Sequence, residues 1–131
     1  MLINVLIVEK ESIISLDLKH KLESMNHIVT VTQSGEEALK IVENNKIDLI
    51  FMAISLQGTL NGLDTAIKIR NQSNIPIIYI SATSNLTILE QLKHTRPFQY
   101  ITKPFEDSQI QTAVNNCLMI IKLNEVREKS V

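Results

Sequence analysis

The feature that most constrains the fold of this chain is the alternation of short apolar runs with longer amphipathic segments. The apolar runs are rich in Ile, Leu and Val and cover residues 2–8, 28–32, 48–54, 76–80 and 98–101. In the segments between and after them, apolar residues recur every three or four positions, which is the spacing of one helix face. These segments cover residues 11–25, a stretch that starts after Ser34, and residues 61–70, 84–94 and 106–123. Strands that alternate with helices form a parallel sheet covered on both faces, so we predict a three-layer α/β/α sandwich.

Two features mark the borders of these elements. Ser34 and Glu37 have the spacing of a capping box at the start of the second helix. Residues 124–131 are polar, and we expect them to form a tail behind a single domain of residues 1–123.

The net charge, the length of the apolar runs and the cysteine content argue against several classes of function. The formal net charge of the 131 residues is −1, which gives no long-range attraction to nucleic acid or to anionic lipid. The apolar runs are far shorter than the roughly twenty residues of a membrane span. The single cysteine, Cys117, allows neither an intrachain disulfide nor a cysteine-based zinc site. We therefore expect a cytoplasmic protein that binds neither nucleic acid nor membranes.

Chemistry-bearing residues follow the predicted strands. In an open parallel sheet, ligands bind at the carboxyl ends of the strands. Four strands end at this edge with Glu9, Lys10 and Glu11, with Ala53, Ile54 and Ser55, with Ser81 and Ala82, and with Thr102, Lys103 and Pro104. This set combines an acid, a hydroxyl group and lysines.

Six stretches of the sequence carry a resemblance to a known family. They are VLIVE at 5–9, DLIFM at 48–52, LQG at 56–58, NGL at 61–63, PIIYISA at 76–82 and YITKPF at 100–105. In this order and spacing, the chain resembles a receiver domain of the two-component response-regulator family over about residues 2–123. The resemblance implies the flavodoxin-like receiver fold, with five parallel strands in the order 2-1-3-4-5.

The resemblance also implies a set of site residues. Receivers accept a phosphoryl group from a histidine kinase on an aspartate at the end of the third strand, beside a magnesium ion held by acidic residues. Glu9 matches the first acid, Ser81 the hydroxyl residue and Lys103 the lysine that contacts the phosphoryl group. Pro104 matches a cis-proline, and Tyr100 matches the aromatic switch position.

Two positions depart from the family pattern. Lys10 replaces the second acid, and Ala53 replaces the aspartate that accepts the phosphoryl group. An ammonium group about 4 Å from a divalent cation would repel it by several kcal/mol. We therefore expect no magnesium, which would require carboxylates at positions 10 and 53, and no other cofactor. We expect Glu9 to lie between Lys10 and Lys103, with the Lys10 ammonium group as an internal substitute for the ion.

These departures leave two functions open. The first is a phosphorylation-independent interaction module in two-component (phosphorelay) signalling, a pseudo-receiver without enzymatic activity. The alternative is a phosphoaccepting receiver whose aspartate at position 53 has been replaced by alanine. A flavodoxin-like cofactor binder is disfavoured because no Ser/Thr/Gly-rich phosphate loop follows the first strand. A hydrolase built on Ser81 would lack the G-x-S-x-G elbow.

The expected partners are signalling proteins such as a histidine kinase or an output domain. The surface formed by the fourth helix, fifth strand and fifth helix is the expected docking or homodimer face. Phe98, Tyr100 and Phe105 fall close to it in the sequence, and aromatic residues are enriched at interfaces. The alternative for these rings is packing inside the domain.

Overall fold

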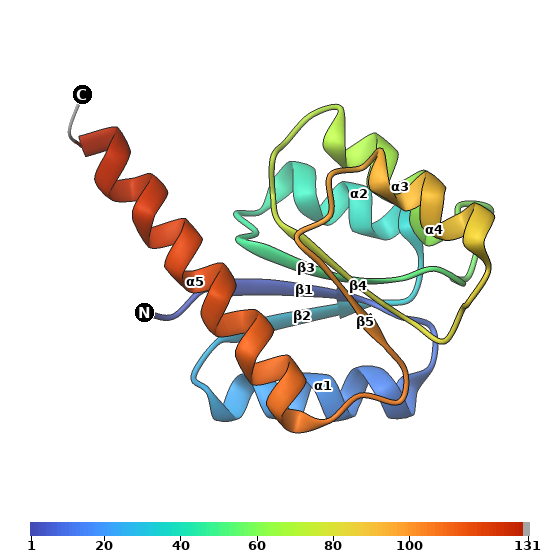
Figure 1. Cartoon of the computed structure of the whole chain (residues 1–131), viewed down its shortest axis with the longest axis horizontal. Coiled ribbons are helices and arrows are strands. Elements are labelled where there is room, and N and C mark those ends of the chain that lie inside the picture. The colour runs from blue at the N-terminus through green and yellow to red at the C-terminus, as the bar shows by residue number, and fades with distance from the viewer. Residues whose placement is uncertain (130–131) are drawn as a thin grey trace.

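The computed structural model describes residues 1–129 of the chain. Five parallel strands form one sheet in the order β2-β1-β3-β4-β5, as predicted. The strands are β1 (Asn4–Val8), β2 (Ile28–Thr32), β3 (Leu49–Ala53), β4 (Ile77–Ser81) and β5 (Gln99–Thr102). The helices are α1 (Ser12–Ser24), α2 (Gly35–Asn44), α3 (Gly62–Arg70), α4 (Leu86–Lys93) and α5 (Asp107–Lys129). The sheet lies between α1 and α5 on one face and α2, α3 and α4 on the other (Figure 1).

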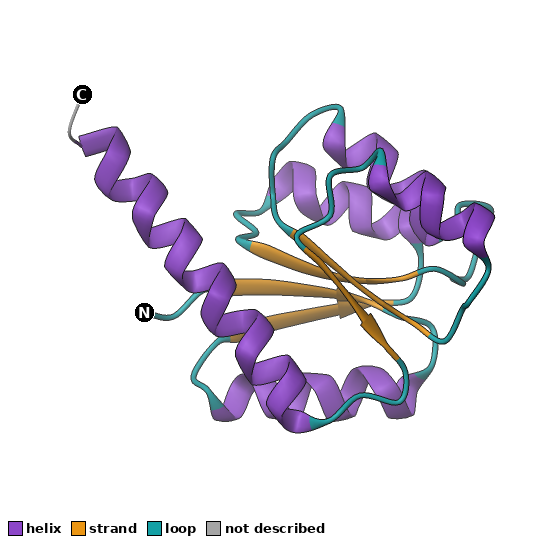
Figure 2. Ribbon diagram, viewed as in Figure 1, coloured by secondary structure: helices purple, strands orange, loops and turns teal. Residues whose placement is uncertain are grey.

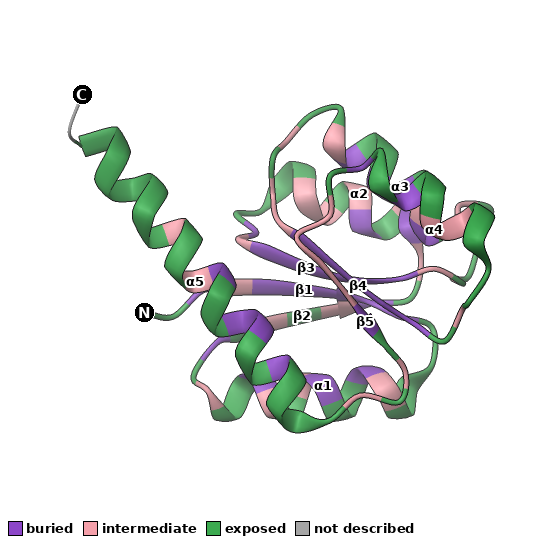
Figure 3. Ribbon diagram, viewed as in Figure 1, coloured by how far each residue is buried: buried purple, intermediate pink, exposed green. Residues whose placement is uncertain are grey.

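Each face of the sheet has its own hydrophobic cluster. Leu18 and Leu22 of α1 and Val114 of α5 pack with alternate residues of the strands on one face. Ala38 of α2 and Ala66 of α3 pack on the other. Every residue of β3 and β4 is buried, which explains why their sequences are continuous apolar runs (Figure 3). The edge strand β2 instead has exposed residues, including Ile28.

The helix starts follow local capping rules. The Ser34 hydroxyl oxygen accepts a hydrogen bond from the Glu37 backbone N–H (3.2 Å), which is one half of the predicted capping box. A complete capping box forms at α3, between Asn61 and Asp64. Gly62 starts α3 against the end of β3, where a Cβ would lie 1.9 Å from the Ala53 carbonyl oxygen. A glycine at position 62 therefore lets α3 begin immediately beside the strand ends.

One predicted boundary is wrong. The last helix was expected to end at Leu123 and to be followed by a polar tail, but α5 continues through Lys129. Figure 2 shows its C-terminal part projecting away from the sheet. The four buried residues of α5 lie between Ile110 and Cys117, so packing does not hold the last turns. Residues of those turns, such as Glu125 and Lys129, have high helix propensity, so the helix continues without packing. The predicted helix end relied on the spacing of apolar residues, and these turns lack that spacing. Residues 130 and 131 of the expected tail lie outside the described part.

Candidate functional site

The predicted strand-end residues converge on one pocket. It has a volume of about 190 Å³ and lies at the carboxyl edge of β1, β3, β4 and β5. Glu9, Ala53, Ser81 and Lys103 all line it. Glu11, which the sequence analysis placed at this edge without a role, lines it as well. The parallel register of the strands brings these residues together from four separate parts of the sequence.

Glu9 and Lys103 form the ion pair of this pocket. The Lys103 Nζ donates to Glu9 Oε1. The second carboxylate oxygen, Oε2, accepts a hydrogen bond from the Glu11 backbone N–H at 3.1 Å. Glu9 is 1% exposed and the Lys103 side chain 17% exposed, so the pair is largely shielded from water. Both oxygens of the buried carboxylate thus have a partner, which removes most of the cost of burying its charge.

Lys10 does not join this pair, which corrects one half of the expected arrangement. Its side chain is exposed and does not line the pocket. Within residues 1–129, no ion pair links Lys10 to Glu9. Lys103 and the Glu11 backbone already occupy both Glu9 oxygens, and an ammonium group is more stable in water than beside a satisfied pair.

Ala53 and Ser81 lie where the sequence places them. Ala53 is 2% exposed, and its side chain belongs to the hydrophobic cluster on the α1 and α5 side of the sheet. A methyl group carries no nucleophilic oxygen, so nothing at position 53 can accept a phosphoryl group. Ser81 is nearly buried, and its Oγ accepts a hydrogen bond from the Thr83 backbone N–H (3.1 Å). The hydroxyl group therefore orders the loop between β4 and α4.

The donor set at this edge does not fit magnesium. Mg²⁺ prefers several oxygen ligands in octahedral geometry, with one or two carboxylates among them. Of the three carboxylates expected in a receiver, only that of Glu9 is present, and Lys103 already neutralises it. Glu11 is the other acid that lines the pocket, so the lining does not provide three carboxylates. In the described part of the chain, no group of three or more His, Cys, Asp and Glu side chains is placed to hold a metal ion.

Glu36 holds the loop between β3 and α3, a role that the sequence analysis missed. Its Oε1 accepts hydrogen bonds from the Thr59 backbone N–H (3.0 Å), the Thr59 hydroxyl (2.8 Å) and the Leu60 backbone N–H (3.0 Å). Hydrogen bonds from its own backbone N–H and from Thr59 and Leu60 lower the pKa of Glu36 to about 2. Glu36 and Glu37 are adjacent acids at a helix start, and the sequence prediction assigned only Glu37, as part of the capping box with Ser34. Nothing in the sequence distinguished Glu36 as the residue that binds a distant loop.

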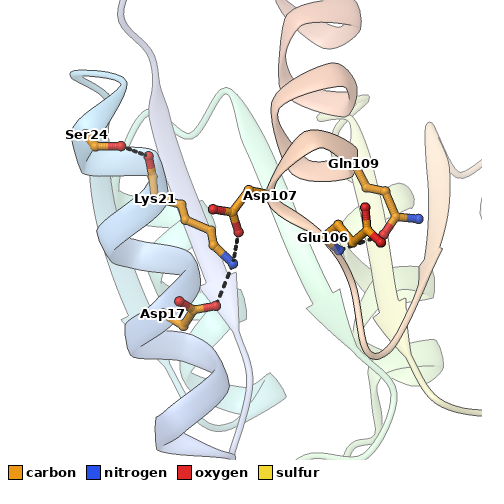
Figure 4. Close-up of polar contacts among 6 residues, drawn as sticks. All are labelled: Asp17, Lys21, Ser24, Glu106, Asp107 and Gln109. Carbon is orange, nitrogen blue, oxygen red and sulfur yellow. Dashed lines mark hydrogen bonds and ion pairs between the residues drawn. The ribbon is translucent and has the colours of Figure 1, made fainter.

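A second unpredicted cluster fixes the start of α5 against α1. The Lys21 Nζ lies 2.7 Å from carboxylate oxygens of both Asp17 and Asp107 (Figure 4). It also lies 5.3 Å from the centre of the Phe105 ring. Partial burial opposes the charged form of Lys21, but the bonds to Asp107 and Asp17 outweigh it and raise the pKa. This cluster anchors the far end of the loop that carries Lys103. Asp17 and Lys21 have the i, i+4 spacing of a helical ion pair, which a local pattern could reveal, whereas the contact of Lys21 with Asp107 depends on tertiary packing.

The three aromatic residues of the expected docking face do not form one exposed patch. Phe98, Tyr100 and Phe105 are all half-buried. Phe98 and Phe105 pack on the cluster beneath α1 and α5, whereas Tyr100 packs on the opposite cluster. The Tyr100 hydroxyl donates a hydrogen bond to the Thr83 carbonyl oxygen (3.1 Å), so the switch-position residue is turned towards the β4–α4 loop. The Lys103–Pro104 peptide bond is cis, as the resemblance implies.

Comparison with known proteins identifies the family. The profile of the response regulator receiver domain matches residues 5–115. The chain belongs to the response regulator receiver domain family. Receiver domains of this family are signalling modules that interact with kinases and output domains.

Similar proteins agree with this assignment. The chain is 29% identical over 123 residues to the transcriptional regulatory protein PdtaR of Mycobacterium tuberculosis. The aligned region covers 93% of this chain and 58% of that protein. The chain is 32% identical over 118 residues to the transcriptional regulatory protein MalR of Bacillus subtilis, covering 88% and 50% of the two chains. The chain thus spans about half the length of these curated relatives.

Solved structures confirm the fold. The signal receiver domain of a modulated diguanylate cyclase from Desulfovibrio desulfuricans G20 superposes with a TM-score of 0.87 at 30% identity, covering 95% of this chain and 99% of that one. NtrX from Brucella abortus superposes with a TM-score of 0.90 at 23% identity, covering all of this chain and 30% of that one. Within the described residues, no helix is long and apolar enough to cross a membrane.

Proposed function

We propose that this receiver is a phosphorylation-independent interaction module of a two-component pathway, without enzymatic activity of its own and without a bound metal ion. The observation that carries the proposal is the pocket itself. Ala53 offers no nucleophile, and Lys103 neutralises Glu9, the acid that matches the family pattern. In a working receiver, Lys103 would be available for the phosphoryl oxygens. Here Lys103 pairs with Glu9 instead.

The alternative, a phosphoaccepting receiver whose aspartate was replaced by alanine, is supported by a different observation. Ser81 and Lys103, which match the family's phosphoryl contacts, line the pocket, and the bond before Pro104 is cis, as the resemblance implies. Lys10 lies in solvent and does not obstruct the pocket. Under this alternative, one substitution at position 53 would restore activity.

We propose that the module docks through the face of α4, β5 and α5, where a second copy of the chain or another signalling protein would bind. Leu86 of α4 is 76% exposed and Ile120 of α5 is 43% exposed. Tyr100 of β5 and Phe98, directly before β5, are half-buried. Aromatic residues are enriched at interfaces, and the buried core of an interface is apolar, which supports this face as the docking surface.

Phosphorylation of designed variants tests the proposal. The unmodified protein and the Ala53→Asp, Lys10→Asp and doubly substituted variants are incubated with acetyl phosphate and magnesium, and intact mass is measured. We expect no phosphoryl adduct on the unmodified protein, little on Ala53→Asp and a clear adduct on the double variant, because only the double variant has carboxylates at all three positions of the family pattern, 9, 10 and 53. Magnesium titration followed by NMR should show the same order.

A further variant separates charge from ligand supply. Lys10→Gln combined with Ala53→Asp removes the ammonium group but adds no carboxylate. Since Lys10 lies in solvent, we expect this combination to behave like Ala53→Asp alone. If Ala53→Asp alone is phosphorylated as readily as the double variant, the alternative function is correct and the proposal fails.

A further inference from the structure

A second pocket lies at the opposite edge of the sheet, away from the strand-end site. It has a volume of about 300 Å³ and is formed by the loops that precede β4 and β5 together with α5. Two arginines, Arg70 and Arg96, line it, and none of its lining residues is acidic. Two cationic groups beside one cavity, without a carboxylate in its wall, form an electrostatic site for an anion.

Arg70 is held rigidly in this pocket. Its Nε donates to the Thr95 carbonyl oxygen (2.7 Å), and its Nη1 donates to the carbonyl oxygens of Ser73 (3.2 Å) and Ile75 (2.9 Å). These neutral partners fix the guanidinium group but leave its charge uncompensated. Within residues 1–129, Nη2 has no hydrogen-bond partner, and no ion pair reaches Arg70 or Arg96. Burial, followed by the nearby charge of Arg96, lowers the pKa of Arg70, so the two guanidinium groups interact unfavourably.

Arg96 has an unusual backbone conformation. Its φ is +53°, in the left-handed region that favours glycine. A side chain in this region costs about 1–2 kcal/mol relative to an unstrained position. The conformation places a second guanidinium group at the pocket wall, although glycine would relieve the strain. Strain of this kind is concentrated at functional sites.

The remaining wall is largely apolar. Pro97, Phe98 and Ile120 contribute it, and Asn124 adds an amide group from α5. The volume matches the lower end of pockets that bind small organic molecules. An apolar wall beside two cations fits a ligand with a compact apolar body and one anionic group, rather than an inorganic ion alone.

We propose that this pocket binds a small organic anion, with its phosphate or carboxylate group between Arg70 and Arg96 and its apolar body against Phe98 and Ile120. The proposal does not depend on the state of the strand-end site. Oxyanions accept charge-assisted hydrogen bonds from guanidinium groups, so phosphate and carboxylate share the required chemistry. Arg70 can donate such a bond from Nη2, because carbonyl oxygens already accept from its Nε and Nη1. The ligand would connect the α4–β5 loop to α5, where that helix leaves the domain.

Titration with model anions tests this proposal. Phenyl phosphate and benzoate are added separately to the ¹⁵N-labelled chain, and amide and Arg Nε–H shifts are followed by NMR; phenol is the uncharged control. We expect saturable shifts confined to Arg70, Arg96, Phe98, Ile120 and Asn124, with no saturation by phenol. The probe with the higher affinity identifies the preferred head group.

Two matched variants complete the test. Arg96→Gln removes one guanidinium group and should weaken binding at least about tenfold, the effect of losing one charge-assisted hydrogen bond. Lys93→Gln removes an equal charge from the nearby end of α4, outside the pocket, and should change affinity less than about twofold. Unchanged affinity in Arg96→Gln, equal binding of phenol, shifts spread over all basic residues, or no saturation by either anion at millimolar concentration would each overturn the proposal.

Discussion

Glu9 lines the receiver site, and its buried charge also affects the stability of the domain. Its carboxylate is almost fully buried, and its two oxygens are bound by the Lys103 ammonium group and the Glu11 backbone N–H. Burying an ion pair gains little over an apolar pair, but removing one partner leaves a buried charge uncompensated. The two lysines near Glu9 should therefore differ sharply in their effect on folding.

Replacement of Lys103 by Met should destabilise the fold by about 3 kcal/mol, because Glu9 would remain buried without a cation. The value lies at the low end of the usual range since part of Lys103 is exposed and water can reach the site. Lys10→Met is the matched control and should change the free energy of unfolding by less than about 0.5 kcal/mol. Urea denaturation measures both. The combination of Lys103→Met with Glu9→Gln should recover much of the loss; equal losses for the two lysine variants would show that Lys103 is not the partner.

Glu36 should give the domain a specific response to acid. Its pKa in the folded chain, about 2, is below the ordinary value of 4.5, because hydrogen bonds from its own backbone N–H and from Thr59 and Leu60 favour the charged form. The stability that it contributes is present above about pH 4.5 and is lost as the pH falls towards 2. Glu36→Gln should therefore be less stable than the unmodified protein at neutral pH, and this difference should shrink across that window. Urea denaturation at several pH values measures the difference, with Glu37→Gln as control; a constant difference would contradict the prediction.

At the scale of elements, the pattern of apolar residues predicted the strands and their common edge, because the sheet is buried on both faces. The runs at β3 and β4 could only be interior strands, and the order of strands brought Glu9, Ala53, Ser81 and Lys103 to one edge. The pairing of Glu9 with Lys103 followed from charge. That Lys10 points to solvent could not be predicted, because a long side chain beside a strand end has several orientations of similar energy. Contacts such as Lys21 with Asp107 depend on tertiary packing alone.

The C-terminal half of α5 should be helical but weakly protected. Its buried residues end at Cys117, and all residues from Lys122 to Lys129 are exposed. Helices of this length without packing are marginal in water. Amide hydrogen exchange should be slow between Ile110 and Leu118 and should become progressively faster beyond Leu123. Uniform protection along the whole of α5 would show that a partner, including a second copy of the chain, covers its end.

At the scale of the whole molecule, the sheet separates two surfaces that carry exposed aliphatic side chains. Ile13 and Leu16 are exposed on α1, on the same side of the sheet as α5. Leu86 is exposed on α4, on the other side (Figure 1). A specific dimer buries about 1,200–2,000 Å² in total, which requires contributions from several elements. The face of α4, β5 and α5 provides three adjacent elements.

Substitution on these two surfaces distinguishes a dimer through α4, β5 and α5 from one through α1. We expect the unmodified chain to form a homodimer at high concentration in size-exclusion chromatography with light scattering. Leu86→Ser should shift the chain towards the monomer, because it removes an apolar side chain from the proposed contact without disturbing the core. Ile13 of α1 is 86% exposed, so Ile13→Ser is the matched control and should leave the dimer intact. Tyr100→Ala should also weaken the dimer, since the ring and its bond to Thr83 order the β4–α4 loop beside the contact. A dimer that Ile13→Ser dissociates and Leu86→Ser does not would assign self-association to α1, and a chain that is monomeric at every concentration would leave the α4, β5 and α5 face to a different protein partner.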